Sequence, residues 1–450
     1  MKRRTDRTPG VKASRRGFLS AGAGLIAAAS AAVGTQRATA APSPTDPHTE
    51  PFWGVHQGGI ATPVQAHSYF AAFDLTTDKR DEVADLLRAW TAASARMAEG
   101  KSAQPLGSGL QPVVLRAQGA SKPEYGSYQP ASLTGVAADS GETFGLPPSR
   151  LTVTFGFGPG LFIKDDKDRY GLGARRPAAL VDIPHFAGDQ LVENHTGGDL
   201  SVQACADDPQ VAFHAVRQLA RLAADVANVR WVQTGFVGNF SAGETPRNLM
   251  GFKDGTVNPP VKDSAAMAQF VWVGDEGPGW MRGGTYLVVR RIRIALEHWD
   301  RMKTVFQERT VGRHKYSGAP LGKEREFDPL DLDAVDKDGN LIVPENAHVR
   351  LAAAASNDGA QFLRRPYSYN DGVDFTAERW PPWRQGLEYD AGLFFIAYQR
   401  DPRTGFIKIY DKMSKLDMMN QFSTHVGSGI FACPGGANQG GFIGQELFGS

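Results

Sequence analysis

Two separated segments of the chain carry side chains that could do chemistry. In residues 251–256 (GFKDGT), two glycines flank Asp254 in a largely apolar neighbourhood. Such a carboxylate can accept and return a proton, or it can cap a turn. In residues 345–350 (ENAHVR), His348 opens an apolar, Ala-rich run. Its imidazole can serve as a metal ligand or as a structural core residue.

The histidines and cysteines limit the metal chemistry. The ten histidines are scattered without a His-x-x-x-His pair, and the two cysteines are Cys205 and Cys433. These counts exclude a Cys cluster for zinc or an iron–sulfur centre and give no support to a metal site made of protein ligands alone. One histidine, such as His348, can still ligate a haem iron, because the porphyrin supplies four nitrogens. The cysteines form either a disulfide or two buried thiols.

Helix-like and strand-like segments alternate along the chain and must position these side chains. The order strand–helix–strand occurs twice, before and after about residue 260, which predicts an α+β fold in two similar halves. The polar stretch 318–347 is long for a loop and is either a surface insertion or a functional flap. The predicted strands are 68–75, 151–157, 229–236, 269–273, 285–294 and 391–399, and the predicted helices are 79–97, 208–226, 295–306 and 416–422.

Length and composition exclude several classes of protein. With 450 residues, 41% hydrophobic and 22% charged, the chain is neither disordered nor a multi-span membrane protein, and it has room for two or three domains. A formal charge of +1 offers no basic excess for binding a nucleic acid. Residues 1–40 hold eight basic residues and one acidic residue, so the remainder carries 41 basic and 47 acidic residues and is mildly acidic.

The first forty residues have the pattern of an export signal. Basic residues at positions 2–16 precede a weakly apolar run at 18–33, and residues 38–40 (ATA) form a small-x-small cleavage pattern. The run is too short for a membrane span, and residues 14–19 (SRRGFL) resemble a twin-arginine signal. We therefore expect residues 1–40 to be a signal peptide, the twin-arginine translocation machinery to be a partner, and the mature protein to be extracellular, cell-surface or periplasmic, with no stable membrane span.

Together, the motifs resemble the dye-decolourising peroxidases, a family of haem enzymes. The GxxDG pattern at 251–255 is similar to the family's signature, and the resemblance covers nearly all of 50–450, with the exported bacterial branch as the nearest match. It implies two ferredoxin-like modules, 41–260 and 261–450, forming a dimeric α/β-barrel-type haem peroxidase fold with haem b (iron protoporphyrin IX) in the second. Further similar segments, in the family's order, are 54–63 (GVHQGGIATP), 155–158 (FGFG), 197–200 (GGDL), 311–313 (VGR), 391–395 (AGLFF) and 441–445 (GFIGQ).

The resemblance assigns roles to three residues that were notable for their types or positions. His348 matches the proximal histidine, whose neutral imidazole binds iron while its other nitrogen donates to an acceptor. Asp390, just before the apolar strand, is the expected acceptor, or else it caps the start of that strand. Asp254 matches the distal acid–base residue, which moves a proton between the two peroxide oxygens. Asp254 must be ionised to act as the base, and an unperturbed aspartate side chain has a pKa of about 4. We therefore expect the best activity in acidic solution.

Other residues gain a role only through the resemblance. Arg364 matches the distal arginine, whose permanent positive charge stabilises negative charge as the O–O bond breaks. The adjacent Arg365 makes this assignment ambiguous. Arg313 is the expected partner of a haem propionate. Phe394 or Phe395 is expected to form an apolar wall of the distal pocket, although both also fit an ordinary core.

The resulting hypothesis is an exported haem peroxidase that reduces hydrogen peroxide and oxidises organic donors such as dyes and phenols. Bulky dyes would be oxidised by electron transfer through surface aromatic residues, with Tyr389, Trp380 and Trp383 as candidates. The alternatives are a haem-iron-releasing, deferrochelatase-like protein and a haem carrier without turnover. A carrier needs neither the acid Asp254 nor the cation Arg364. The sequence leaves the physiological donor and the oligomeric state open.

Overall fold

The computed structural model describes residues 46–106, 138–238, 240–241, 244–377 and 385–449. These residues belong to one compact unit, 46–450. The predicted signal peptide lies outside the described residues. Both cysteines are free and buried, so the structure shows two thiols and no disulfide between them.

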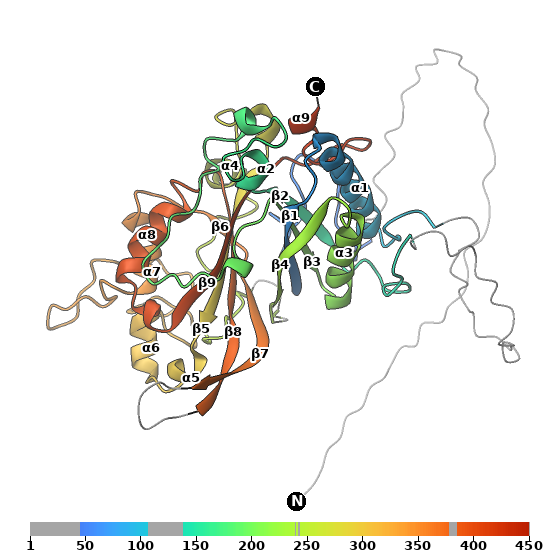
Figure 1. The fold of residues 1–450 in the computed structure, drawn as a ribbon. Coiled ribbons are helices and arrows are strands. Elements are labelled where there is room, and N and C mark those ends of the chain that lie inside the picture. Colours follow the sequence, from blue (N-terminus) through green and yellow to red (C-terminus); the bar gives the residue numbers. More distant parts are fainter. Residues whose placement is uncertain (1–45, 107–137, 239, 242–243, 378–384, 450) are drawn as a thin grey trace, which may run out of the picture. The chain divides into compact units, whose positions relative to one another are not determined.

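The first half of the unit is a βαββαβ module of the ferredoxin-like kind. Its helices α1 and α3 lie on one side of a sheet with the order β2-β3-β1-β4 (Figure 1). Asp208 caps the start of α3, where its side chain accepts hydrogen bonds from the backbone of Gln210 (2.7 Å) and Val211 (3.2 Å). The elements are β1 (His67–Leu75), α1 (Arg80–Ala98), β2 (Thr152–Phe157), β3 (Leu200–Ala206), α3 (Pro209–Leu222) and β4 (Ala227–Phe236), and the short α2 (Pro159–Phe162) follows β2.

The second half repeats the module with an insertion between its first two long strands. The sheet order is β9-β5-β8-β7, and the helices lie on the side away from the first module (Figure 1). The elements are β5 (Thr285–Ile294), α5 (Leu296–Trp299), α6 (Thr304–Val311), α7 (His348–Ala352), β6 (Leu363–Arg364), β7 (Tyr367–Ala377), β8 (Gln385–Gln399), α8 (Phe406–Leu416) and β9 (Ser423–Cys433), with α4 (Ser264–Phe270) before them and α9 (Gln445–Phe448) after them.

The strands of the two modules join into one antiparallel sheet that closes on itself. Phe157 of β2 pairs with Ala432 of β9, and Phe236 of β4 pairs with Ser368 of β7. Since β5 pairs with both β8 and β9, the described strands form a ring, and β6 extends it along β8. The α+β class with two ferredoxin-like modules is therefore confirmed.

Strand alternation divides the side chains between the inside of this ring and the helices outside it. Phe70, Phe394 and Phe431 meet inside, with ring centroids 5.3–5.9 Å apart for the pairs that include Phe70. Outside the first module, Trp90 of α1 packs at 5.1 Å on Phe73, and its indole N–H donates to a carbonyl of α3 at 2.8 Å. The outer face of the second module is covered by α5–α8 and carries the candidate site.

Three predicted elements differ from the structure. The predicted strand 269–273 is wrong, because Asp263 caps a helix, α4, that extends to Phe270. The predicted helix 295–306 is two short helices, α5 and α6, with a break between them. The predicted helix 416–422 is only a 3-10 turn at Met418–Gln421. The stretch 318–347 contains no helix or strand longer than an isolated bridge among its described residues.

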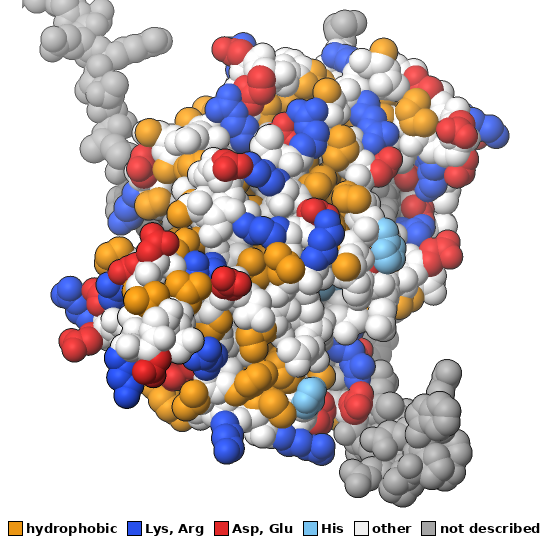
Figure 2. Space-filling view, turned by 90° about the vertical axis from the view of Figure 1, so that its left-hand side faces the viewer, with side chains coloured by type: hydrophobic (Ala, Val, Ile, Leu, Met, Phe, Trp, Pro, Cys, Tyr) orange, Lys and Arg blue, Asp and Glu red, His pale blue; other side chains and the backbone are white. Residues whose placement is uncertain are grey.

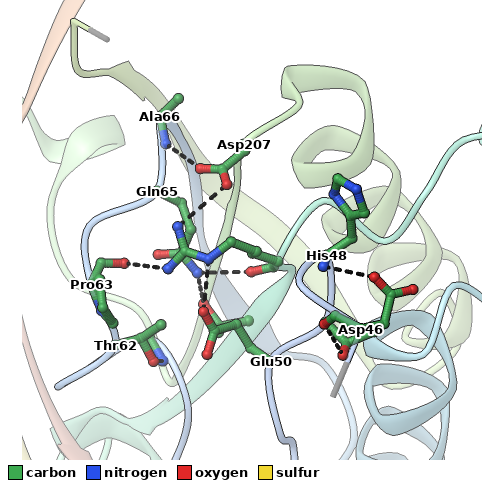
Figure 3. Close-up of polar contacts among 12 residues, drawn as sticks. Asp46, His48, Glu50, Thr62, Pro63, Gln65, Ala66 and Asp207 are labelled. Carbon is green, nitrogen blue, oxygen red and sulfur yellow. Dashed lines mark hydrogen bonds and ion pairs between the residues drawn. The ribbon is translucent and has the colours of Figure 1, made fainter. Parts of the chain in front are cut away.

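A partly buried arginine, Arg150, ties the first described residues to the ring (Figure 3). The guanidinium of Arg150 donates to Glu50 at 2.8 Å, to the Pro63 carbonyl at 3.1 Å and to Asp207 at 3.3 Å. The carbonyl of Arg150 accepts from the Gln65 amide at 2.9 Å. Segment 46–66 is thereby held where its carbonyl groups reach the second module.

The face of the second module that carries α6–α8 shows no large patch of a single charge in Figure 2. Figure 2 shows basic and acidic side chains interspersed there among apolar ones. No helix among the described residues has the length and apolar character needed to cross a bilayer.

Candidate functional site

His348 is the first residue of α7, and a carboxylate fixes its ring. Nδ1 lies 2.7 Å from Oδ2 of Asp417. Asp417 caps the turn after α8, with Oδ1 accepting from the Met419 backbone at 2.8 Å, and its side chain is only 3% exposed. The carboxylate therefore accepts a hydrogen bond from the Nδ1–H group, which leaves Nε2 of a neutral ring with a lone pair.

The surroundings of His348 suit a metal ligand. Its side chain keeps 31% of its surface exposed, and Nε2 has no hydrogen-bond partner among the residues that the structure describes. Burial opposes the imidazolium form, but the Asp417 carboxylate outweighs that effect and raises the pKa of His348 above its usual value. A more basic imidazole is a stronger electron donor to a bound metal ion.

Asp254 and Arg364 form the second part of the site. Nη1 of Arg364 donates to Oδ1 of Asp254 at 2.9 Å, and the Asn248 amide lies 3.4 Å from the other oxygen. Asn258 bonds both backbone groups of Arg364, at 2.7 Å and 3.1 Å. Both charged side chains are thus oriented by neighbours while remaining partly accessible, at 13% for Asp254 and 26% for Arg364.

The backbone conformation explains why glycine occupies both ends of the GxxDG pattern. Gly251 has a φ of +86° and Gly255 a φ of +120°. Side chains strongly disfavour both conformations, so glycine at these positions lets the chain turn on each side of Asp254. The pattern found in the sequence is therefore the means by which the Asp254 carboxylate is presented.

Asp254 and Arg364 line a cavity of about 210 Å³, together with Asn248, Asn258 and Leu393. The same two charges act on His348: the Arg364 guanidinium lowers the pKa of the imidazole and the Asp254 carboxylate raises it. The structure therefore brings together three residues that are far apart in the sequence. A large apolar cluster adjoins them and contains Val349 and Leu393 among its members, the others being Met250, Phe252, Ile294, Leu296, Trp299, Met302, Phe306, Val311, Met419 and Phe422.

Arg313 lies on the same side of the second module. Its Nη1 donates to the carbonyl oxygens of Gly318 at 2.6 Å and Glu326 at 2.9 Å. Burial lowers the pKa of its guanidinium; Glu326 acts in the opposite direction, and the positive charge of Arg364 lowers it further. The arginine is thus fixed in place near Arg364, which is compatible with the predicted propionate contact.

The structure places the two adjacent arginines on opposite sides of the chain. Arg364 points to Asp254, whereas Arg365 is 2% exposed and donates to the Thr62 carbonyl and to the Gln65 side chain. Successive residues of an extended chain point to opposite sides. Arg365 therefore joins the second module to segment 46–66, and Arg364 faces the site.

The expected contact between Asp390 and His348 is wrong, and the same alternation turns Phe394 inward, where it has the core role that was its alternative. Asp390 does not contact His348; both of its oxygens accept from Arg291, at 2.8–2.9 Å. It lies on the face of β8 that also presents Phe394, which packs on Phe70 and Trp231 inside the ring. Neither residue therefore faces the cavity that Leu393 lines.

Phe395 lies on the other face of β8, the face of Leu393. It is half-buried against Phe362 and Phe406, at 6.0 Å and 5.7 Å between ring centroids. Its expected role in the pocket wall stays a prediction. Tyr389 shares this face and is 49% exposed, whereas Trp380 and Trp383 lie outside the described residues.

Sequence reasoning missed Asp417, Asn248 and Asn258. Asp417 lies 69 positions from His348, inside a segment that was predicted to be helical. Its one local signal is that of a helix cap, which gives no information about the residue that its second oxygen will meet. Asn248 contacts Asp254 across a turn, and Asn258 contacts Arg364, which is 106 positions away. Neither contact could be read from the neighbouring sequence.

Comparisons with known proteins identify the family of the chain. The N-terminal domain of the Dyp-type peroxidases matches residues 57–237, and the C-terminal domain matches residues 245–438. The chain is 37% identical to the dye-decolorizing peroxidase of Thermobifida fusca, over 87% of this chain and 83% of that one. It is 33% identical to the deferrochelatase of Escherichia coli K12, over 96% of each.

A solved structure shows the same arrangement of elements. The DyP-type peroxidase of Streptomyces coelicolor is 38% identical, with a TM-score of 0.75 over 90% of this chain and 98% of that one. The free Nε2 of His348, the apolar cluster and the nearby arginines fit a haem, which is the cofactor of such enzymes. The chain belongs to the Dyp-type peroxidase family and is a haem-dependent peroxidase.

Proposed function

We propose that His348 is the iron ligand and that Asp254 and Arg364 act together on hydrogen peroxide. The observation that carries this proposal is the convergence of the three residues. The 2.9 Å pair of Asp254 and Arg364 lines the cavity and acts electrostatically on an imidazole whose Nε2 is free. When bound, the haem supplies the iron at which the peroxide O–O bond is cleaved.

The protein's own groups move the proton and balance the charge. The Asp254 carboxylate takes the proton from the nearer peroxide oxygen and returns it to the farther one, which leaves as water. Arg364 stabilises the negative charge that develops as the bond breaks. Two electrons from donors and two protons complete the reduction of one peroxide to two waters. Asn248 and Asn258 are positioning residues, because they hold the carboxylate and the backbone of Arg364.

The dimensions of the cavity support oxidation of bulky donors at the surface. Its volume of about 210 Å³ is below the ~300–1,000 Å³ of typical small-molecule sites. Small phenols can approach the site, whereas large dyes would donate through an exposed aromatic residue. Of the three candidates, Tyr389 lies among the described residues, and it is 49% exposed. Tyr389→Phe should slow turnover of a bulky dye and leave a small phenol unaffected; unchanged dye turnover would remove this residue from consideration.

Rapid mixing with hydrogen peroxide tests the roles of the two distal residues. With haem-loaded protein, the peroxide-dependent change of the haem spectrum should slow about 10²–10⁴-fold in Asp254→Asn. Arg364→Ala should slow it as well, and His348→Ala should lose or alter the haem spectrum itself. The matched control is Asp338→Asn in an exposed turn. A wild-type spectrum that is indifferent to peroxide would instead identify a haem carrier.

Iron release from haem is the second candidate function. It is favoured by the deferrochelatase of E. coli, which matches over nearly the full length of both chains. Release would leave metal-free porphyrin, which fluoresces whereas haem does not. Porphyrin fluorescence that grows with turnover and is lost in His348→Ala would support this function. Its absence under conditions where donors are oxidised would support the peroxidase alone.

We further propose that the protein is exported by the twin-arginine route and acts outside the cytoplasm. The support is the sequence of residues 1–40, in which basic, apolar and small-residue segments follow one another in the order of a signal. The double substitution Arg15→Lys, Arg16→Lys should retain the unprocessed chain in the cytoplasm. N-terminal sequencing of exported wild-type protein should begin near residue 41.

A further inference from the structure

A second cluster of ligand-type side chains lies in the first module, apart from the haem-binding half of the chain. His214 projects from α3, while Asp139 and Glu142 belong to the segment that precedes β2. The side chain of Asp139 is fully buried, that of His214 is 4% exposed and that of Glu142 is 20% exposed. The peroxidase mechanism uses none of these residues.

The imidazole of His214 lies between the two carboxylates, and each of its ring nitrogens faces one of them. The imidazole Nε2 lies 3.4 Å from Asp139, and Nδ1 lies 3.1 Å from Glu142. One nitrogen of the ring and one oxygen of each carboxylate all lie within 4.8 Å of one another. A tetrahedral zinc ion with bonds near 2.0–2.2 Å places its ligands about 3.4 Å apart. An ion on one ring nitrogen would therefore require the carboxylate that faces the other nitrogen to move toward it, from a separation of at most 4.8 Å.

The surroundings orient the carboxylates as they do in built metal sites. Both oxygens of Asp139 accept backbone N–H groups, from Ala103 at 2.7 Å and from Gly141 at 2.7 Å. Glu142 accepts from the Ser140 hydroxyl and, at 3.1 Å, from Arg217. Such outer contacts fix ligand geometry around a metal ion. They also show that the pocket is organised around negative charge.

The charge of the cluster calls for a compensating cation. Two carboxylates and a neutral imidazole carry a charge of −2, which is costly where one of the carboxylates is fully buried. Arg217 meets Glu142 alone and is half exposed. A divalent ion neutralises the cluster and uses nitrogen and oxygen ligands together, which is the preference of zinc and its first-row neighbours.

We propose that Asp139, Glu142 and His214 bind a divalent transition-metal ion, with water completing its coordination. The ion would cross-link residues 139–142 to α3 and would serve a structural purpose. The competing arrangement is an imidazolium that donates one hydrogen bond to each carboxylate, with no ion bound. The two arrangements differ in whether the cluster takes up metal.

Calorimetric titration of the haem-loaded protein with Zn²⁺ tests the proposal. Wild type should bind one equivalent, and the affinity should fall at least about 10–100-fold in His214→Gln. The same loss is expected in Glu142→Gln, which is partly exposed and therefore serves if the buried histidine variant fails to fold. His185→Gln, at an exposed histidine, is the matched control and should bind as wild type does.

X-ray absorption at the zinc edge gives a readout that the haem iron does not affect. The bound ion should show a shell of nitrogen and oxygen neighbours near 2.0–2.2 Å with outer scattering from one imidazole. The imidazole contribution should disappear in His214→Gln. A wild-type protein that binds no Zn²⁺, or a site that persists unchanged in His214→Gln and Glu142→Gln, would overturn the proposal in favour of the imidazolium.

Discussion

Nδ1 of His348 lies 2.7 Å from Oδ2 of Asp417, and Asp417 is itself held by a backbone N–H of the turn that it caps. The buried carboxylate thus has one oxygen for the helix end and one for the imidazole. This contact sets the tautomer and the orientation of the ring, and it leaves Nε2 free for the iron that we propose it binds. The partner of the proposed iron ligand is therefore a helix-capping residue.

The contact predicts unequal effects for two aspartates of the second module. Asp417→Asn should weaken haem binding or slow the reaction with peroxide by about 10–100-fold, because an amide no longer strengthens the imidazole as a donor. The haem reduction potential should rise, which spectroelectrochemistry measures directly. Asp390→Asn is the matched control, because Asp390 bonds Arg291 on the other face of β8. An unchanged potential in Asp417→Asn, or an equal rise in Asp390→Asn, would contradict the assignment.

Adjacent phenylalanines on β8 should likewise separate stability from the properties of the site. Phe394 is fully buried inside the ring, so Phe394→Ala should lower the free energy of unfolding by about 3–5 kcal/mol. Its haem spectrum should match wild type. Phe395→Ala is expected to cost less stability and to shift the haem spectrum, because Phe395 shares the face of Leu393. Urea titration and absorption of the two variants check this, and a spectral change confined to Phe394→Ala would refute it.

A buried histidine predicts the pH dependence of stability. Burial, reinforced by the Arg290 guanidinium, holds the pKa of His425 well below its usual value. Nε of Arg290 donates to Nδ1 at 2.8 Å, which requires that nitrogen to be unprotonated. The unfolded chain takes up a proton near pH 6.5 and the folded chain does not. The contribution of His425 to the free energy of unfolding is therefore fully present above that pH. Below it, the contribution is lost at a rate that approaches about 1.4 kcal/mol per pH unit.

Replacing His425 tests this dependence. His425→Gln keeps an acceptor for Arg290 but does not titrate, so its free energy of unfolding should fall less steeply than that of wild type between pH 6.5 and pH 5. Urea titrations at several pH values provide the slopes. His185→Gln, at an exposed histidine, should retain the wild-type slope. Parallel slopes for wild type and His425→Gln would show that this histidine is not the source.

Local patterns determined much of the fold. The predicted strands 68–75, 151–157 and 285–294 match β1, β2 and β5 to within a residue or two, and the predicted helix 79–97 matches α1. These predictions succeed because the apolar residues of one strand or helix lie close together in the sequence, so a short segment contains the whole signal. Short elements failed, as at residues 269–273, where the cap at Asp263 prevails over a strand-like composition.

The sequence by itself also determined that Asp254 is presented between glycines, since the need for positive φ is local. The family resemblance indicated His348 and Arg364 as its partners. Tertiary structure alone decided which carboxylate meets His348, which of two adjacent arginines faces Asp254, and that Asp139, Glu142 and His214 lie in one cluster. The physical reason is that a side chain's partner depends on strand parity and on chain closure over many tens of residues, and neither leaves a mark on the neighbouring sequence.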